Sequence, residues 1–223
     1  MSVWPAVWLT LQLAAVSTAI LMVIALPFGW WLATTRAKSR PLFEAVTALP
    51  LVLPPTVLGF YLLILMRPDA PLGGFFVRVT GETLAFSFTG LVIASVVYSF
   101  PFAVQPMQTA FKAVPQSTMD AARTLGASPR DAFFTIALPM ASRGAITAAV
   151  LSFAHTVGEF GVVLIVGGNI PGKTRVISIE IFSAVETLDY ATAHILSAWL
   201  LVLSMVVLTL VYALNRRGGS RFG

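Results

Sequence analysis

Apolar residues occur along the chain in five long runs separated by shorter polar segments. A membrane-spanning helix needs about 20 predominantly apolar residues, and helices of that length are the simplest way to satisfy the backbone in lipid. The pattern therefore predicts an all-α integral membrane protein, with residues 1–223 forming one membrane domain. The predicted spans cover roughly residues 7–34, 46–66, 86–107, 142–167 and 193–214.

Prolines fall inside two of these runs. Pro50, Pro54 and Pro55 lie near the start of the second run, where a straight, fully hydrogen-bonded helix would not accommodate them. A kinked helix start and an irregular backbone that lines a cavity both explain them. Pro101, near the end of the third run, predicts a break in the helix before the polar segment that follows.

Residues 108–141, here called the coupling segment, are the polar stretch between the third and fourth runs. Two four-residue patterns in it, Ser117 to Asp120 and Ser128 to Asp131, match the [ST]-x-x-[DE] capping box that marks the start of a helix. The segment is thus predicted to contain two short helices.

The same segment carries signals for helix ends. Gly126 favours the left-handed conformation that terminates a helix, and Pro139 is predicted to stop the second helix. Two capped helices joined by a tight turn are typical of a docking element in water, although an ordinary loop between spans is the alternative. The residues available for contact are Ala121, Ala122, Leu125, Phe133, Phe134 and Ile136.

The coupling segment resembles the EAA loop of permease subunits from binding-protein-dependent ABC importers. The resemblance rests on Asp120-Ala121-Ala122, on Gly126 after three further residues, and on Ile136-x-Leu138-Pro139. The family more often has glutamate at the first position, so Asp120 is a conservative departure. The resemblance implies a type I importer-like fold in which these residues contact a cytoplasmic ATPase. It also implies a permease homodimer and an extracytoplasmic oxyanion-binding protein as partners.

The fourth run holds the most conspicuous ionisable residues. Glu159 is the acidic residue placed well inside a predicted span, and His155 precedes it by one helical turn on the same face. An ionisable group in a span is costly and is a functional hypothesis by default, with a structural hydrogen bond between helices as the alternative. Together with Gly158, Phe160 and Gly161, these residues are candidates for a pore or gate.

Two stretches in the second half of the chain make the resemblance specific to one branch of the family. Residues 158–161, Gly-Glu-Phe-Gly, and the polar loop 168–175 resemble the molybdate branch of the permease family. The resemblance therefore implies an oxyanion substrate, most directly molybdate. After the loop, apolar positions from Ile177 to Leu188 recur at helical spacing and predict an amphipathic outer helix. We find no arginine or lysine near the middle of any predicted span, which fits a path that leaves substrate selection to a binding protein.

The basic residues divide into two sets along the chain, and the larger set is expected on the cytoplasmic side. The larger set consists of Arg36, Lys38, Arg40, Lys112, Arg123, Arg130, Arg143, Arg216, Arg217 and Arg221. The smaller set consists of Arg67, Arg78, Lys173 and Arg175. This division predicts an outside N-terminus, a cytoplasmic C-terminus and a cytoplasmic coupling segment. Membrane topology and contact with anionic lipid therefore explain the net charge of +5. The sequence shows no basic face interleaved with aromatic residues, which a nucleic-acid-binding protein would have.

Composition agrees with this class and limits the chemistry. Hydrophobic residues make up 57% of the chain and charged residues 10%, against about 25% charged residues in soluble domains. The chain has no cysteine, and we expect no catalytic residue, cofactor or metal site. Residues 167–174 match G-x-x-x-x-G-K-[ST], but they follow a predicted span on the outer side, where a nucleotide-binding loop would not function. ATP hydrolysis is thus expected in a partner subunit.

Two other functions compete with a permease. A proton-coupled secondary transporter or channel would use His155 and Glu159 to couple proton movement. A membrane-embedded enzyme is less well supported, because one Glu–His pair without a second carboxylate, a metal cluster or an activated nucleophile makes a weak active site.

Overall fold

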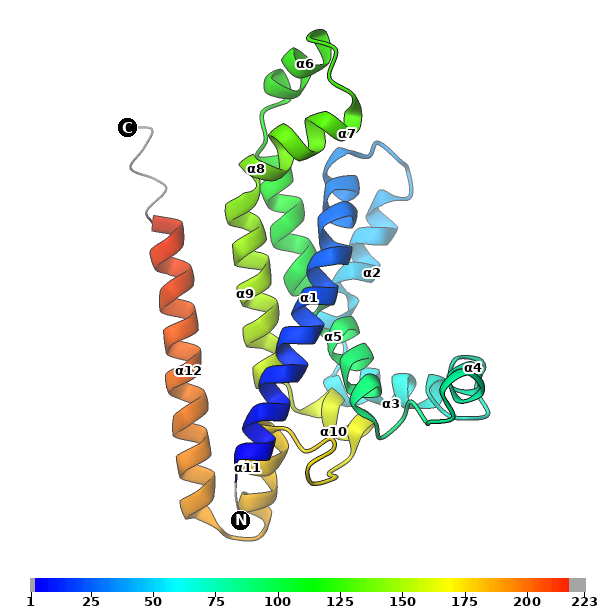
Figure 1. The fold of residues 1–223 in the computed structure, drawn as a ribbon, viewed down its shortest axis with the longest axis vertical. Coiled ribbons are helices and arrows are strands. Elements are labelled where there is room, and N and C mark those ends of the chain that lie inside the picture. Colours follow the sequence, from blue (N-terminus) through cyan, green and yellow to red (C-terminus); the bar gives the residue numbers. More distant parts are fainter. Residues whose placement is uncertain (1–2, 217–223) are drawn as a thin grey trace.

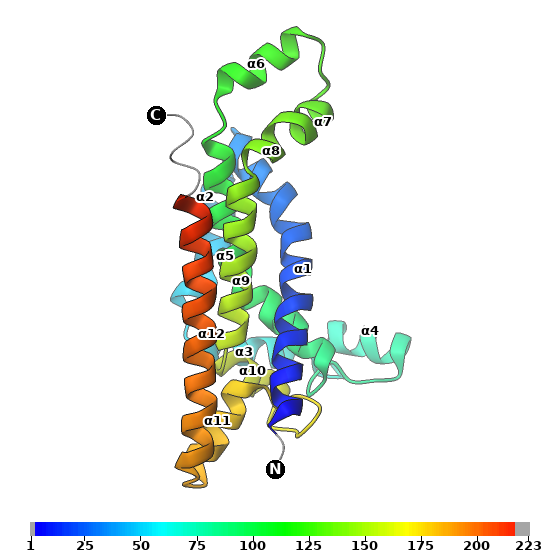
Figure 2. The ribbon, with the colours of Figure 1, turned by 60° about the vertical axis from the view of Figure 1, so that its left-hand side comes forward.

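The computed structural model describes residues 3–216 as a bundle of long helices with short helices at both ends (Figure 1). Two views show the long helices running along the same axis (Figures 1 and 2). α5 lies at the centre and packs against α1, α2 and α9, and α1 also packs against α9. The long helices are α1 (Trp4–Thr34), α2 (Arg40–Val52), α5 (Phe88–Lys112), α9 (Ser142–Gly158) and α12 (Tyr190–Arg216).

The short helices gather at the two ends of the bundle. One end, at the top of Figure 1, carries α6 (Gln116–Thr124), α7 (Pro129–Ala132), the π-helix η1 (Phe133–Ala137) and α8 (Leu138–Met140). The other end carries α3 (Pro55–Leu65), α4 (Pro71–Thr80), α10 (Gly161–Gly167) and α11 (Ile177–Glu186). The start of α1 and the end of α12 lie at opposite ends, as an odd number of crossings requires.

Three of the predicted spans are single helices, and two are broken. α1, α5 and α12 are each long and apolar enough to cross a membrane, and there are up to five spans if each bent pair of helices counts as one. The second run breaks between α2 and α3, which meet at 110°. The fourth run is also broken, because α9 ends at Gly158 and α10 begins at Gly161.

The predicted proline break in the third run is wrong. Pro101 and Pro106 both lie inside α5, which continues to Lys112 and thus into the coupling segment. Half of the apolar window of α5 is buried by its neighbours. Packing on several sides holds the helix together, because neighbouring helices compensate for the backbone hydrogen bonds that a proline removes.

The main apolar core joins the bundle to the coupling segment. Its buried members include Leu21 of α1, Met107 of α5 and Ala148 of α9. Met119 of α6 and Ala137 of η1 belong to the same cluster. The coupling segment is therefore an extension of the packed core.

α12 lies at the edge of the molecule. Only 11% of its apolar window is buried, and its contacts are chiefly with α9 and α11. Large apolar side chains such as Trp199 and Leu201 are more than half exposed along it. A helix with this surface requires lipid or another membrane helix around it.

Candidate functional site

The turn after α6 has the geometry that the sequence predicts. Gly126 has φ +85°, in the left-handed region. The Gly126 N–H donates to the carbonyl of Arg123 (3.0 Å), and the Ala127 N–H donates to the carbonyl of Ala122 (3.0 Å). These two bonds define a Schellman motif, which satisfies carbonyls that a helix end leaves free. A Cβ at position 126 would meet no atom within 4 Å, so glycine is favoured here by the backbone angle alone.

Of the two predicted capping boxes, one forms. The Ser128 hydroxyl accepts a hydrogen bond from the Asp131 N–H (3.2 Å), and the Asp131 carboxylate accepts one from the Ser128 N–H (3.3 Å). The prediction for Ser117 is wrong, because α6 begins at Gln116 after Pro115 and has no side-chain cap. Asp120 instead accepts hydrogen bonds from the side chains of Gln116 (3.0 Å) and Arg123 (3.0 Å) within the same helix.

The second helix of the coupling segment widens after its first turn. The Leu138 N–H donates to the carbonyl of Phe133, five residues earlier, which is the π-helical pattern. The Thr135 hydroxyl donates to the carbonyl of Asp131 (2.6 Å). Pro139 lies inside α8, which ends at Met140 before a 68° bend into α9. The prediction that Pro139 stops this helix is therefore wrong, and the chain turns two residues later.

An aromatic cluster fixes the coupling segment to the bundle. The ring centroid of Phe133 lies 5.5 Å from that of Trp30 on α1 and 5.8 Å from that of Phe111 on α5. Trp30 and Phe111 also contact each other edge to face at 5.2 Å. Such pairs each contribute about 0.5–1.5 kcal/mol beyond the burial of their area. No local sequence signal brings Trp30 to Phe133, because the two positions lie far apart in the chain.

The predicted coupling residues divide into an outer and an inner group. Ala122 is buried, and Ile136 and Leu138 pack against the core. Asp120, Ala121, Gly126 and Pro139 are exposed. The large apolar side chains that face outward are Leu125, 88% exposed, Phe134, 64% exposed, and Met140, 51% exposed. Three exposed apolar side chains on a polar projection indicate a surface that another protein covers.

The second candidate site lies where α9 breaks. Glu159 adopts an extended conformation after α9, and its carbonyl accepts a hydrogen bond from the Ser178 hydroxyl on α11 (2.5 Å). α10 then packs against α3, the helix that follows the other break. The two broken runs thus meet at one level of the bundle (Figure 1).

Glycines allow α3 and α10 to approach closely. A Cβ on Gly161 would lie 2.7 Å from the Cβ of Pro55, and a Cβ on Gly59 would lie 2.9 Å from the Cβ of Ile165. Both distances are shorter than a carbon–carbon contact of about 3.5–4.0 Å. Gly158 differs from them, because a Cβ there would meet no atom within 4 Å.

His155 is held by α5. Its Nδ1 lies 2.8 Å from the Ser99 hydroxyl oxygen, and that oxygen lies 3.1 Å from the Thr156 hydroxyl oxygen. The imidazole ring stacks on Phe102, with centroids 3.9 Å apart, and also contacts Tyr98. These contacts match the structural alternative for His155, a hydrogen bond between helices.

Glu159 is 4% exposed, and neither carboxylate oxygen has a hydrogen-bond partner of standard geometry among the described residues. The Ser95 hydroxyl on α5, itself buried, is a polar group that faces it. Among residues 3–216, no lysine or arginine forms an ion pair with Glu159, and no hydrogen bond joins it to His155. Burial of a carboxylate without a cation is costly.

All five predicted gate residues line one cavity of about 550 Å³. They are His155, Gly158, Glu159, Phe160 and Gly161. Pro55 and Thr56 of α3, Tyr98 of α5 and Ala154 complete the lining. The prolines predicted an irregular backbone near Pro55, where α3 begins. No sequence signal placed α3 and Tyr98 against the α9 break.

The segment that matches the phosphate-loop pattern serves the fold. It follows helix α10, where a phosphate loop would follow a strand. The Thr174 hydroxyl is buried and donates to the carbonyl of Gly167 (2.7 Å), which closes the turn. The helix predicted after this loop is confirmed as α11, although Leu188 lies beyond its end.

Comparison with known proteins identifies the class of this chain. Residues 25–218 match the family model described as "Binding-protein-dependent transport system inner membrane component", and the chain belongs to this family. It is therefore a multi-pass protein of the inner membrane and a permease component of an ABC transporter.

Individual relatives of the chain come from molybdenum and sulfate transport systems. The chain is 52% identical to the molybdenum transport system permease protein ModB of Azotobacter vinelandii, over 95% of this chain and 93% of that protein. It is 38% identical to ModB of Escherichia coli strain K12, over 82% of this chain and 80% of that protein. The sulfate transport system permease protein CysT of Salmonella typhimurium is 32% identical, over 95% of this chain and 76% of that protein.

Solved structures share the fold. A bacterial ABC transporter involved in the import of the acidic polysaccharide alginate matches with a TM-score of 0.75 at 15% identity, over 96% of this chain and 79% of that chain. An inward-facing MetNI methionine ABC transporter matches with a TM-score of 0.69 at 22% identity, over 96% of this chain and 99% of that chain. These matches confirm an all-α fold of the ABC importer type.

Proposed function

We propose that this protein is the permease subunit of a molybdate importer, driven by a separate ATPase. The assignment of molybdate as the substrate rests on the 52% identity to a molybdenum transport permease over nearly the whole of both chains. CysT of Salmonella typhimurium, a sulfate transport permease, is 32% identical. The whole chain acts as one permease domain, and molybdate is delivered to it by an extracytoplasmic binding protein.

The coupling segment is the proposed contact with the ATPase. Leu125 and Phe134 project from it with most of their surface free, while Phe133 ties the segment to α1 and α5 through Trp30 and Phe111. A force applied to the exposed side chains would therefore reach the core directly. The coupling contact would transmit ATP-driven closure to the cavity at the α9 break, which we assign to the gate.

Two permease chains form the path in this proposal. A short helical chain does not enclose a polar route alone, and α12 leaves apolar surface for lipid or a second copy. The end of the molecule with the coupling segment faces the cytoplasm, because it holds the described members of the larger basic set, which are Arg36 to Arg143 and Arg216 at the end of α12. Arg217 and Arg221 lie outside the described residues.

Uptake tests the substrate. Cells that lack the gene and cells that regain it are compared for ATP-dependent uptake of molybdate, with excess tungstate or sulfate as competitor. Uptake that returns with the gene and is inhibited by tungstate but not by sulfate supports the proposal. Uptake that does not depend on the gene, or that sulfate abolishes, would indicate that another oxyanion is the substrate.

A matched pair of variants tests the coupling contact. Leu125→Ser removes an apolar side chain that is 88% exposed, whereas Phe75→Ser removes one that is 60% exposed on α4, at the opposite end. Both variants should fold. Only Leu125→Ser should weaken binding of the ATPase to the purified permease, and equal binding by the two variants would refute the assignment.

The absence of cysteine makes the orientation testable. Ser117→Cys on α6 and Lys173→Cys near α11 place single thiols at exposed positions on opposite ends. A membrane-impermeant maleimide should label the Lys173→Cys variant in intact cells and the Ser117→Cys variant only after permeabilisation. The reverse result would invert the proposed topology.

A further inference from the structure

A cavity of about 910 Å³ lies between the coupling segment and the adjacent ends of α1, α2 and α5. Its described lining residues include four basic side chains and no aspartate or glutamate. The four are Arg36 in the α1–α2 turn, Arg40 at the start of α2, Lys112 at the end of α5 and Arg123 on α6. Trp30, Gln116 and Met119 also line it.

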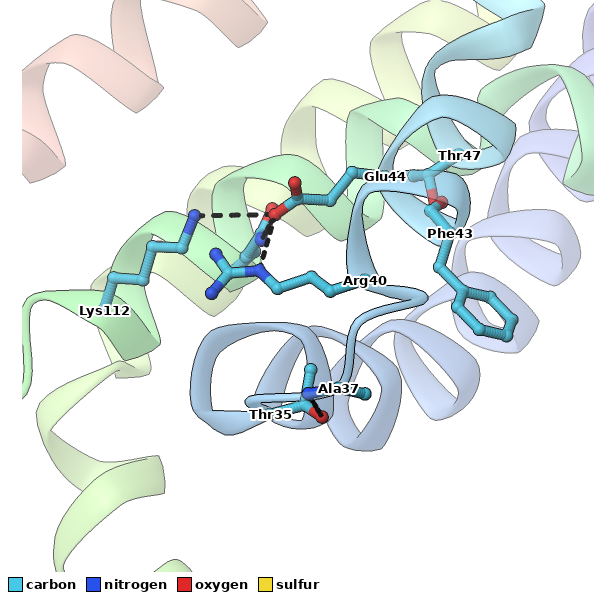
Figure 3. A network of polar contacts seen from close by, with 8 residues as sticks. Thr35, Ala37, Arg40, Phe43, Glu44, Thr47 and Lys112 are labelled. Atoms are coloured by element: carbon cyan, nitrogen blue, oxygen red, sulfur yellow. Dashed lines mark hydrogen bonds and ion pairs between the residues drawn. The ribbon is translucent and has the colours of Figure 1, made fainter.

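Two of these cations share one carboxylate that is not itself part of the cavity lining. Arg40 Nε lies 3.0 Å and Lys112 Nζ lies 3.8 Å from the same oxygen, Oε1 of Glu44. Gln108 donates to that oxygen at 2.6 Å. Figure 3 shows Arg40 and Lys112 reaching from two helices toward Glu44, so one negative charge is divided between two positive ones.

The other two cations come from two further parts of the lining, the α1–α2 turn and α6. Arg123 pairs with Asp120 at 3.0 Å, and its side chain remains 62% exposed. Arg36 is exposed and has no ion-pair partner among residues 3–216. Four cations and two carboxylates, Glu44 and Asp120, leave a local net charge of +2.

Membrane topology accounts for the side on which these residues lie but not for their convergence. The positive-inside rule is met equally well by basic residues spread over the surface. Here they come from four separate elements and surround one concavity. A concave surface lined by charges of one sign concentrates counter-ions, and arginine side chains match the oxygens of phosphate-like groups in geometry as well as charge.

We propose that this cavity binds a tetrahedral oxyanion, either a free dianion or the singly charged phosphate of an anionic lipid headgroup. Both sources offer the same chemistry to the four basic side chains. An oxyanion held between Arg36 and Arg123 ties α6 to the α1–α2 turn. The binding itself does not depend on the transported substrate, whereas a regulatory effect on ATPase contact rests on the proposed function.

The test measures binding of inorganic phosphate to the full-length permease by calorimetry, in nanodiscs of phosphatidylcholine and of phosphatidylglycerol. The test variant carries Arg36→Gln and Arg123→Gln, which change exposed side chains and leave the Glu44 network intact. The control variant, Arg78→Gln, removes an exposed arginine from α4 at the opposite end. We expect saturable binding in phosphatidylcholine that weakens with added salt. Affinity should fall at least about tenfold in the double variant and not in the control.

The two nanodisc lipids separate the sources of the oxyanion. Equal phosphate binding in both lipids identifies a free oxyanion. Loss of phosphate binding in phosphatidylglycerol, with more of this lipid retained by the wild type than by the double variant, identifies the headgroup. If neither phosphate binding nor lipid retention depends on Arg36 and Arg123, the proposal is overturned.

Hydrogen exchange tests the link across the cavity. Occupancy should slow exchange of the α6 amides in the wild type and leave the double variant unchanged. Phosphate binding that leaves α6 exchange unaltered would overturn the bridge between Arg36 and Arg123. Because neither experiment includes the ATPase or molybdate, their outcome is independent of the uptake result.

Discussion

Gly158 and Gly161 lie on either side of Glu159 and Phe160, and replacing each glycine by alanine is predicted to change stability in opposite directions. Gly158→Ala adds a methyl group at the end of α9, where no atom lies within 4 Å of the new Cβ. Gly161→Ala adds the same methyl group at the start of α10, 2.7 Å from the Cβ of Pro55. The ring of Pro55 has no rotamer that moves this Cβ away, so α3 and α10 must separate.

The structure sets the size of each effect. Alanine is favoured over glycine in a helix by about 0.5–1 kcal/mol, so Gly158→Ala should be neutral or mildly stabilising. Forcing a methyl group into a packed contact costs about 1–3 kcal/mol, which outweighs any helix preference at Gly161. The two variants should therefore differ by roughly 2–3 kcal/mol, or on the order of 5–10 °C in thermal midpoint for a chain of this size.

Thermal unfolding of the purified variants in detergent, followed by tryptophan fluorescence, measures this difference. Molybdate uptake by the same variants reports whether α3–α10 packing matters for transport, and we expect only Gly161→Ala to lose activity. Equal midpoints for Gly158→Ala and Gly161→Ala, or a lower midpoint for Gly158→Ala, would refute the reasoning from close packing.

Three further predictions concern the coupling segment and the buried carboxylate. Ser128→Ala should lose about 1 kcal/mol of helix capping, while Ser117→Ala should change stability by less than about 0.5 kcal/mol, and hydrogen exchange of the two short helices would contradict this if both variants behaved alike. Gly126→Ala should cost about 1–2 kcal/mol in the turn and Gly126→Asn less, because asparagine tolerates left-handed backbone angles; equal exchange of the turn amides in both variants would argue against it. Glu159→Gln should keep or raise the thermal midpoint, since the amide removes an ionisable group that is buried without a cation, and a clear loss of stability would show that the carboxyl group has a partner it needs.

The turn between α6 and α7 was predictable because its signals are local. Gly126 acts through its own backbone angle, and Ser128 caps a helix through a residue only three positions away. The same reasoning failed for Ser117 because α6 starts one residue before it, after Pro115. A capping pattern therefore marks the start of a helix only where the helix has not already begun at an earlier residue.

Prolines show where local reasoning ends. Pro101 lies within a continuous helix, whereas Pro54 lies at a 110° bend. α5 is packed on several sides, so its neighbours maintain the helix despite the missing backbone hydrogen bond. α3 gains contact with α10 by leaving the line of α2, and Gly59 makes that contact close.

By itself, the sequence determined that the protein is a membrane-spanning helical permease with a coupling turn. Long apolar runs, helix caps and a family motif all act through chain neighbours or composition. Only the tertiary structure decided that Glu159 follows the end of α9 in a cavity beside α3, and that Arg36 and Arg123 line one other cavity. These groupings depend on helices distant in sequence, because burial, close glycine contacts and convergent charges arise only when those helices pack.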